Sequence, residues 1–287
     1  ETMFPGPALD DAGAMAINRD GYSEANNIRD HFLALQSELR VPMLVGAITA
    51  TNIRIDQQGR QSQDATYNSA YLVRNGQVQT NRYDKIAPTP FGETLPYIKS
   101  VPWLQNLVLQ IGLGASGMDF GLDAGTKAAP IEIETESGVI RAATPICFES
   151  SQSRICRQIA NGGPGADLMI VMTNDGWFGD SDHGRAMHVL LARWRCLELG
   201  LPMARVANTG QSCFIDAKGR VTDMLPPQEA GVLTGQVRQD AGLSRTPYRT
   251  VGNLVGWAAL AGMLALLAGA IIKRIKDKPA GDTKRES

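Results

Sequence analysis

Apolar runs separated by polar turns dominate the chain and predict strands with helices between them. Runs with the length and composition of buried strands lie at 42–51, 66–74, 77–83, 131–134, 139–146, 167–173, 203–207, 211–215 and 220–224. Apolar residues recur with helical spacing at 23–39, 150–161 and 183–199. Buried strands with intervening helices are typical of layered α/β proteins.

Two short turns predict β-hairpins within this pattern. Asn75 and Gly76 separate two of the apolar runs, and this dipeptide favours the tight turn that joins antiparallel strands. Ser137 and Gly138 separate another pair of runs in a similar way. Antiparallel strand pairs are therefore expected beside the buried strands that alternate with helices.

The segment at about 89–130 is long and has no regular pattern. Apolar residues are frequent at 91–109, and a glycine-rich run follows at 112–125. A loop of this length in a compact domain is usually functional or disordered, and the apolar content argues against disorder. Two interpretations stay open: a lid-like insertion that also touches lipid, or a short helix at 103–111 packed on the core.

An uncharged stretch at 251–272 carries the membrane signal of the sequence. As a helix it would be roughly 33 Å long, enough to span a bilayer. A buried core helix is the alternative, which the length and the basic residues that follow disfavour. The cluster from Lys273 to Lys278 predicts a cytoplasmic C-terminus by the positive-inside rule. Residues 1–245 would then form one domain on the outer face, and 273–287 a basic, polar cytoplasmic tail.

Composition and charge exclude some classes of function. The 287 residues have a formal net charge of −1, whereas nucleic-acid-binding proteins usually carry a basic face, so no nucleic-acid partner is expected. The histidines and cysteines lack metal-ligand spacing, so no metal site is expected. A disulfide such as Cys156–Cys196 stays open, because nothing in the sequence selects or excludes it.

Cys147 stands where the apolar run at 139–146 ends, shortly before a helical pattern begins. A cysteine at such an elbow is well placed to be a nucleophile, because the backbone is rigid and a helix N-terminus favours thiolate. A buried structural cysteine is the alternative. His188 is disfavoured as its general base, since it lies within a helical pattern and could only bond the backbone or a neighbour. Lys85 is better placed, although a solvated loop charge is its alternative.

Motifs spaced along nearly the whole chain carry a resemblance to a known family. Besides Lys85 and Cys147-Phe148-Glu149, they are Glu1-Thr2-Met3-Phe4-Pro5, Tyr67-Asn68-Ser69, Pro90-Phe91-Gly92-Glu93, Thr173 to Asp180, Ala207 to Gly210 and Thr246 to Thr250. With them the chain resembles the nitrilase, or carbon–nitrogen hydrolase, superfamily. The block around Trp177 and the C-terminal helix resemble its acyltransferase branch, which acts on apolipoproteins. The resemblance implies an α/β fold: a nitrilase-like α-β-β-α sandwich with one C-terminal transmembrane helix.

The resemblance also implies a Glu–Lys–Cys triad. Glu1 would be the general base, Lys85 would stabilise the oxyanion, and Cys147 would be the nucleophile. Glu93 and Glu149 would be supporting carboxylates that position the lysine and the base.

Further positions match residues that line or brace the pocket in this family. They are Asn68, Phe148 and Trp177, with core packing as the alternative for Trp177. For Asn174 and Asp175 we favour a turn cap.

The activity implied by the resemblance is ping-pong acyl transfer. Cys147 would attack an acyl ester of a membrane phospholipid resembling phosphatidylethanolamine, giving a thioester and a lysophospholipid. The N-terminal amine of a diacylglyceryl-modified apolipoprotein cysteine would then take the acyl chain. No cofactor is expected. The protein is expected to be a monomer in a bacterial cytoplasmic (inner) membrane, with its catalytic domain on the periplasmic face.

The sequence departs from the family pattern at Glu1, Phe148 and Thr89. Glu1 is both the triad carboxylate and the first residue, and the family's preceding membrane helices are missing. The chain is therefore expected to be a catalytic fragment of a longer protein, which could be inactive alone. Phe148 stands where tyrosine is common in the family. Two other functions stay open: a membrane-tethered amidase with the same triad, and a non-catalytic lipoprotein-binding module.

Overall fold

The computed structural model describes residues 24–56, 61–90, 92–94, 121–238 and 246–276. The chain forms two compact units, residues 1–246 and 247–287. Glu1, the helix expected at 103–111 and most of the lid-like insertion lie outside the described residues.

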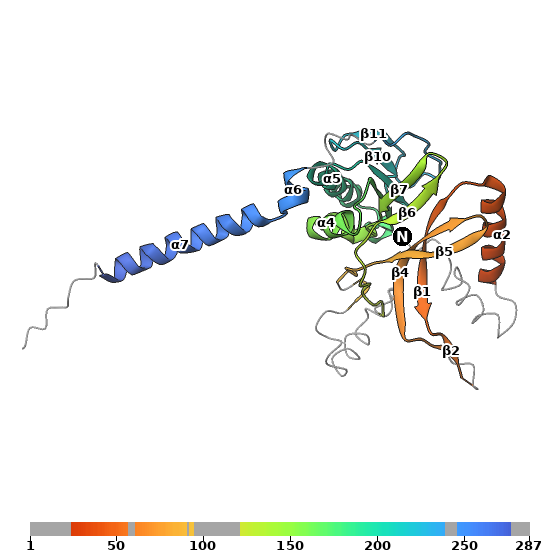
Figure 1. The fold of residues 1–287 in the computed structure, drawn as a ribbon, viewed down its shortest axis with the longest axis horizontal. Helices are drawn as coiled ribbons and strands as arrows, with labels where there is room; N and C mark the ends of the chain where they lie inside the picture. Colours follow the sequence, from red (N-terminus) through yellow and green to blue (C-terminus); the bar gives the residue numbers. More distant parts are fainter. Residues whose placement is uncertain (1–23, 57–60, 91, 95–120, 239–245, 277–287) are drawn as a thin grey trace, which may run out of the picture. The chain divides into compact units, whose positions relative to one another are not determined.

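A six-stranded sheet forms one half of the first unit, with the strand order β11-β10-β9-β8-β7-β6 (Figure 1). Its strands are β6 (Ile131–Thr135), β7 (Gly138–Ala143), β8 (Leu168–Thr173), β9 (Met203–Ala207), β10 (Cys213–Ile215) and β11 (Val221–Met224). The central strands β7, β8 and β9 run parallel, and the flanking pairs are antiparallel. Met169 and Val171 of β8 are fully buried, as expected for a central strand that is covered on both faces.

A second, antiparallel sheet has the order β1-β4-β5. Its strands are β1 (Met43–Thr51), β4 (Ala65–Arg74) and β5 (Gln77–Asp84). A separate pair of antiparallel strands is formed by β2 (Arg54–Ile55) and β3 (Gln61–Ser62). Asn75 and Gly76 turn β4 into β5 with φ angles of +53° and +67°, the left-handed values that the expected turn requires. The prediction of this hairpin is confirmed.

Helices cover the outer faces of the two sheets (Figure 1). Helix α2 (Glu24–Leu39) contacts β4, whereas α4 (Ser153–Asn161) contacts β7 and packs beside α5 (Asp182–Leu199). The sheets meet where β5 contacts β6. Ser181 caps α5 by accepting a hydrogen bond from the Gly184 amide, and Gly200 ends it in the left-handed conformation. The α-β-β-α sandwich expected from the sequence is therefore confirmed.

The elbow before α4 differs from its prediction. Strand β7 ends at Ala143, and the apolar run continues only as a single parallel bridge between Ile146 and Met172. Pro145 explains the early end, because proline has no amide hydrogen to donate to a strand ladder. A 3-10 turn, η2 (Cys147–Ser151), comes before α4, so the α-helix begins later than predicted.

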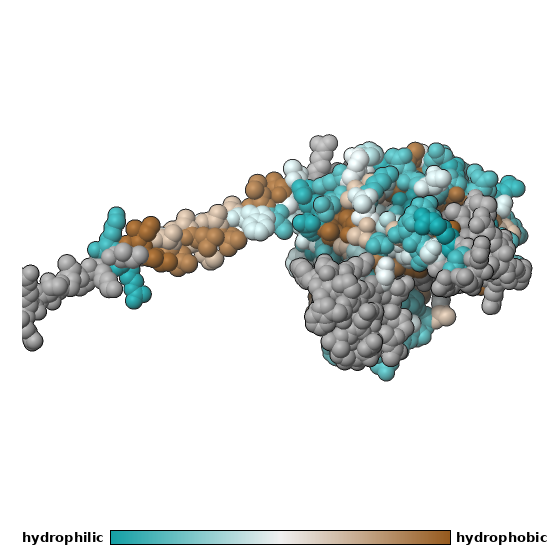
Figure 2. Space-filling view, turned by 90° about the horizontal axis from the view of Figure 1, so that it is seen from below, coloured by the Kyte–Doolittle hydropathy of each residue, from teal (hydrophilic) through white to brown (hydrophobic). Residues whose placement is uncertain are grey.

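The second unit holds a short helix and a long apolar one. Helix α6 (Pro247–Val251) is followed by Gly252 with a φ of +58°, and α7 (Leu254–Lys276) begins after that break. The long apolar helix therefore begins at Leu254, and not at residue 251 as predicted. By length and composition Leu254–Arg274, with a mean hydropathy of 2.2, could cross a membrane. Figure 2 shows apolar atoms along this helix.

Burial of the central strand should dominate the stability of the first unit. Val171 is fully buried, whereas Val232 is 89% exposed. Val171→Ala should lower the free energy of unfolding by about 2 kcal/mol, because it removes buried methyl groups and leaves a cavity. Val232→Ala, the same chemical change, should alter it by less than about 0.5 kcal/mol. Urea unfolding followed by tryptophan fluorescence measures both, and equal effects would contradict this account of the core.

Candidate active site

Cys147 begins the 3-10 turn with its backbone in a strained conformation. Its φ is +49°, a left-handed value that costs a non-glycine residue roughly 1–3 kcal/mol. The residue is 8% exposed and lines a cavity. Strain of this kind persists only where the surroundings impose it, so the neighbours of Cys147 must hold the elbow in place.

The Glu149 carboxylate is one of these neighbours and is completely buried. It accepts hydrogen bonds from the amides of Ile146, Ile86 and Ala87 at 2.8–2.9 Å and from the Tyr83 hydroxyl at 2.9 Å. Burial raises the pKa of Glu149 to about 6, although the amide hydrogen bonds oppose that rise. This carboxylate therefore ties the end of β5 to the residue immediately before Cys147.

Lys85 and Glu93 form a buried ion pair beside that junction. The Lys85 Nζ lies 2.7 Å from Glu93 Oε2, and their side chains are 1% and 7% exposed. Glu93 also accepts hydrogen bonds from the Asn68 side chain at 3.0 Å and from the Thr89 amide at 2.7 Å. Burial would raise the pKa of Glu93, but the Lys85 ammonium and these bonds hold it down at about 2. The pair is therefore ionised, and Lys85 is not the solvated loop charge of the alternative interpretation.

The ion pair lies against the cavity that Cys147 lines. Thr89 is 3.4 Å from the Lys85 Nζ and is itself part of the cavity wall. Lys85 also lowers the pKa of Glu149 through its charge. Of the site residues expected from the sequence, the structure brings together Lys85, Glu93, Asn68 and Glu149 around this wall, and Glu1 lies outside the described residues.

The cavity on Cys147 has a volume of about 350 Å³ and a mostly apolar lining. Its lining residues are Thr89, Cys147, Phe148, Ser151, Asn174, Trp177, Phe178, Gly184, Met187, His188 and Leu191. Phe148 is 37% exposed and Trp177 is 50% exposed. Trp177 therefore lies at the cavity rather than in the core, so the core-packing alternative for it is wrong.

A buried polar network on the other side of Cys147 was not expected from the sequence. Asp175 is fully buried and binds Arg205 at 2.8 Å and His188 at 2.9 Å. Burial would raise the pKa of Asp175, but the bonds to His188 and Arg205 hold it down at about 2. Asn174 does cap the turn, accepting from the Gly176 amide. For Asp175 the turn-cap prediction is wrong, because its carboxylate belongs to this buried network. The sequence feature that could have indicated a buried ion pair was the charge of Arg205 inside an apolar strand.

The remaining cysteines are structural. Cys156, Cys196 and Cys213 are buried and free, so the disulfide Cys156–Cys196 is not formed. Burial raises the pKa of all three thiols, which keeps them protonated and unreactive at neutral pH. Among the described residues, no group of three or more histidine, cysteine or acidic side chains could hold a metal ion.

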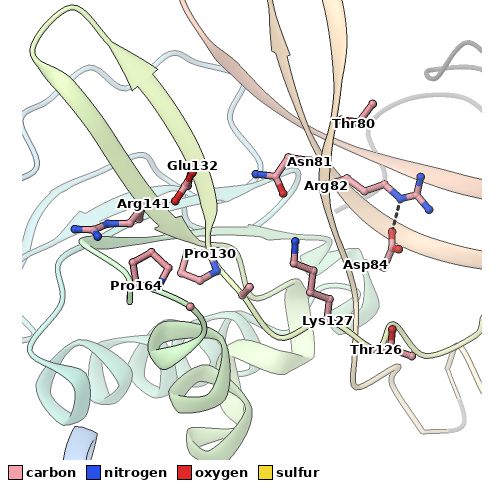
Figure 3. A pocket seen from close by; sticks show the side chains of 12 residues that line it. Thr80, Asn81, Arg82, Asp84, Thr126, Lys127, Pro130, Glu132, Arg141 and Pro164 are labelled. Carbon is pink, nitrogen blue, oxygen red and sulfur yellow. Dashed lines mark hydrogen bonds and ion pairs between the residues drawn. The ribbon is translucent and has the colours of Figure 1, made fainter.

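A second cavity of about 750 Å³ lies between β5 and β6 (Figure 3). Arg82 and Asp84 on its wall bind each other at 2.8 Å, and Lys127, Glu132 and Arg141 add charges of both signs. Its described lining shares no residue with the cavity on Cys147. The chemistry expected from the sequence therefore belongs to the smaller, apolar cavity.

Comparisons with known proteins show the family of the chain. Residues 32–245 match the carbon-nitrogen hydrolase family. The chain is 33% identical over 207 residues to an apolipoprotein N-acyltransferase from Geobacter metallireducens, covering 72% of this chain and 36% of that protein. It is 34% identical to another from Haemophilus influenzae, covering 69% of this chain and 35% of that protein. The chain thus spans little more than a third of the length of these relatives.

A solved structure is also similar. It is an amidase from Nesterenkonia sp., with a TM-score of 0.47 and 16% identity, covering 72% of this chain and 64% of that one.

The raised pKa of Glu149 should make stability depend on pH. The folded state binds this proton more tightly than the unfolded chain, where the pKa is 4.5. The contribution of Glu149 to the free energy of unfolding is therefore complete below pH 4.5, and it should fall by about 2 kcal/mol as the pH rises through 6. Urea unfolding at several pH values from below 4.5 to neutrality measures this fall in the free energy of unfolding.

Two variants isolate this effect. Glu149→Gln cannot titrate, so the fall should be missing, whatever its stability at a single pH. Glu136 is exposed, and Glu136→Gln should keep the pH dependence of the wild type. The same fall in Glu149→Gln would show that another group causes it.

Proposed function

Since the chain belongs to the carbon–nitrogen hydrolase family, we propose that Cys147 is the nucleophile of a lipid acyltransferase. It takes an acyl chain from a membrane phospholipid and passes it to the N-terminal amine of a diacylglyceryl-modified apolipoprotein cysteine. One observation carries the proposal: the strained Cys147 faces an apolar cavity whose wall adjoins the buried Lys85–Glu93 pair. The names of the relatives support the choice of reaction.

The first half-reaction acylates Cys147. The thiol proton passes to the Glu1 carboxylate, and the sulfur attacks the ester carbonyl of the phospholipid. Lys85 stabilises the oxyanion of the tetrahedral intermediate. The carbon–oxygen bond then breaks, and Glu1 returns the proton to the departing lysophospholipid oxygen.

The second half-reaction releases the acyl chain to the acceptor. The amine nitrogen attacks the thioester carbonyl, Glu1 takes the proton from nitrogen, and the carbon–sulfur bond breaks. Glu1 then returns that proton to the Cys147 sulfur. Water would compete with the amine for the thioester, so an apolar lining that excludes water favours transfer over hydrolysis.

The shape and chemistry of the cavity support a lipid donor. Phe148, Trp177, Met187 and Leu191 give the cavity on Cys147 an apolar lining. Trp177 and Met187 are also about half exposed, so the apolar surface continues to the outside. Exposed apolar surface at a pocket is typical of a site for an apolar ligand.

The apolar helix supports a location at the membrane. Leu254–Arg274 is long enough to cross a bilayer, and Lys273, Arg274 and Lys276 form a basic end. By the positive-inside rule this end lies in the cytoplasm, so the Cys147 domain lies on the periplasmic face of the cytoplasmic membrane. The phospholipid donor is then available in the outer leaflet beside the domain.

An amidase that hydrolyses a small carbon–nitrogen substrate is the second candidate function. The same triad of Glu1, Lys85 and Cys147 would serve it. The exposed apolar side chains at the cavity and the apolar helix favour the acyltransferase, because a small polar amide needs neither.

Incubation of the full-length protein with phosphatidylethanolamine vesicles should leave one acyl chain on the peptide that contains Cys147. Mass spectrometry of proteolytic peptides measures the adduct. Cys147→Ala should carry none, whereas Cys156→Ala, which alters a buried thiol, should be acylated like the wild type. Absence of the adduct in the wild type, or an equal adduct in Cys147→Ala, would refute the proposal. Turnover of a small amide without lipid would favour the amidase.

Loss of the Lys85 ammonium should slow thioester formation by about 100- to 1,000-fold, the usual effect of removing one oxyanion donor. Lys85→Met alone also leaves Glu93 as a buried charge without its partner, which should cost about 3–5 kcal/mol of stability. The double variant Lys85→Met with Glu93→Gln removes that charge and should recover much of the stability. Near-normal acylation in the double variant would show that Lys85 has only a structural role.

A further inference from the structure

We propose that His188 is a positioning residue for Cys147, holding the backbone carbonyl of the elbow with the proton on its Nε2. The inference rests on the proposed function in one respect, that Cys147 is the nucleophile. His188 would act through the backbone of that residue, and not as a base.

Hydrogen-bond geometry around the Cys147 carbonyl identifies the donor. The Ser150 hydroxyl donates to this oxygen at 2.7 Å, and His188 Nε2 lies 3.3 Å from the same oxygen and 3.1 Å from Ser150 Oγ. A serine hydroxyl has one hydrogen, and here it is used toward the carbonyl. With the Ser150 hydrogen on the carbonyl, Nε2 faces two oxygen acceptors, and a proton on Nε2 satisfies this arrangement.

The other ring nitrogen is held by the buried ion pair. His188 Nδ1 lies 2.9 Å from Asp175 Oδ1 and 3.2 Å from Arg205 Nη2. A protonated Nδ1 donates to Asp175, and an unprotonated Nδ1 accepts from Arg205. With the proton on Nε2, a neutral ring accepts at Nδ1 from Arg205, and an imidazolium ring donates from Nδ1 to Asp175, so the ion pair holds the ring in the same direction in both charge states.

Packing also fixes the plane of the ring. The Phe178 ring lies edge-on to His188 with their centroids 5.7 Å apart, and His188 is 6% exposed. A ring held on its edges and its face can keep the Cys147 carbonyl in one direction. Because that carbonyl sets the ψ angle of Cys147, the contact reaches the residue whose φ is left-handed.

The rate of Cys147 alkylation by iodoacetamide tests the role without any acyl donor. His188→Leu removes the donor and should slow alkylation by about 10-fold, the effect of losing one hydrogen bond. His188→Gln places an amide N–H near the position of Nε2 and should stay within about 3-fold of the wild type. His183 is exposed on the same helix, and His183→Gln should leave the rate unchanged.

The ring proton can also be observed directly in the wild type. In full-length protein labelled with ¹⁵N-histidine, in detergent micelles at neutral pH, Nε2 of His188 should give the ¹⁵N shift of a protonated nitrogen. The signal is assigned by its loss in His188→Gln.

Three results would overturn the inference: an unprotonated Nε2, a His188→Leu rate within 2-fold of wild type, or a His188→Gln rate as low as that of His188→Leu. Alkylation remains measurable if phospholipid acylation fails, so failure of the proposed function and failure of this inference can be distinguished.

Discussion

The buried Glu149 carboxylate is the constraint on which the site depends. Three amides and the Tyr83 hydroxyl converge on it, and these donors come from both sides of the sandwich. An acceptor with fewer lone pairs would leave buried donors unsatisfied, each at a cost of about 1–3 kcal/mol. Removing the charge from water costs free energy as well, which is why burial raises its pKa to about 6. Burial of the Glu149 charge therefore lowers the free energy of unfolding, while its hydrogen bonds hold the backbone next to Cys147 in place.

The sequence predicted most of the fold, since apolar periodicity and turn chemistry are local. The hairpin at Asn75 and Gly76 and helix α5 follow from residues that are neighbours in the chain. The end of β7 was misplaced because the apolar run continues to Ile146, whereas Pro145 stops the ladder. A run of apolar residues indicates burial, but it does not show whether each residue can donate a hydrogen bond to the neighbouring strand.

The site was predicted less evenly. Spaced motifs selected Lys85, Glu93 and Cys147, and the structure places the Lys85–Glu93 pair against the cavity that Cys147 lines. Asp175 was assigned to a turn because its partner Arg205 is distant in sequence and reaches it only through the pairing of β8 with β9. A charge in an apolar strand indicates that a buried partner exists, but it does not identify that partner. Apolar periodicity therefore cannot predict an ion pair between residues that are distant in the sequence.

Cys147 lies between two buried ion pairs, one from each half of the sandwich. Lys85 and Glu93 follow β5 of the smaller sheet, whereas Asp175 and Arg205 belong to the end of β8 and to β9 of the larger one. Neither system is expected to be stable when only half formed, because an unpaired buried charge costs several kcal/mol. Glu149 joins the two halves, because it accepts from the amides of Ile86 and Ala87 after β5 and from the amide of Ile146 after β7, so both sheets hold the strained elbow. The left-handed conformation of Cys147 is therefore expected only in the completed sandwich, and a partly folded chain would lose the backbone geometry of the elbow.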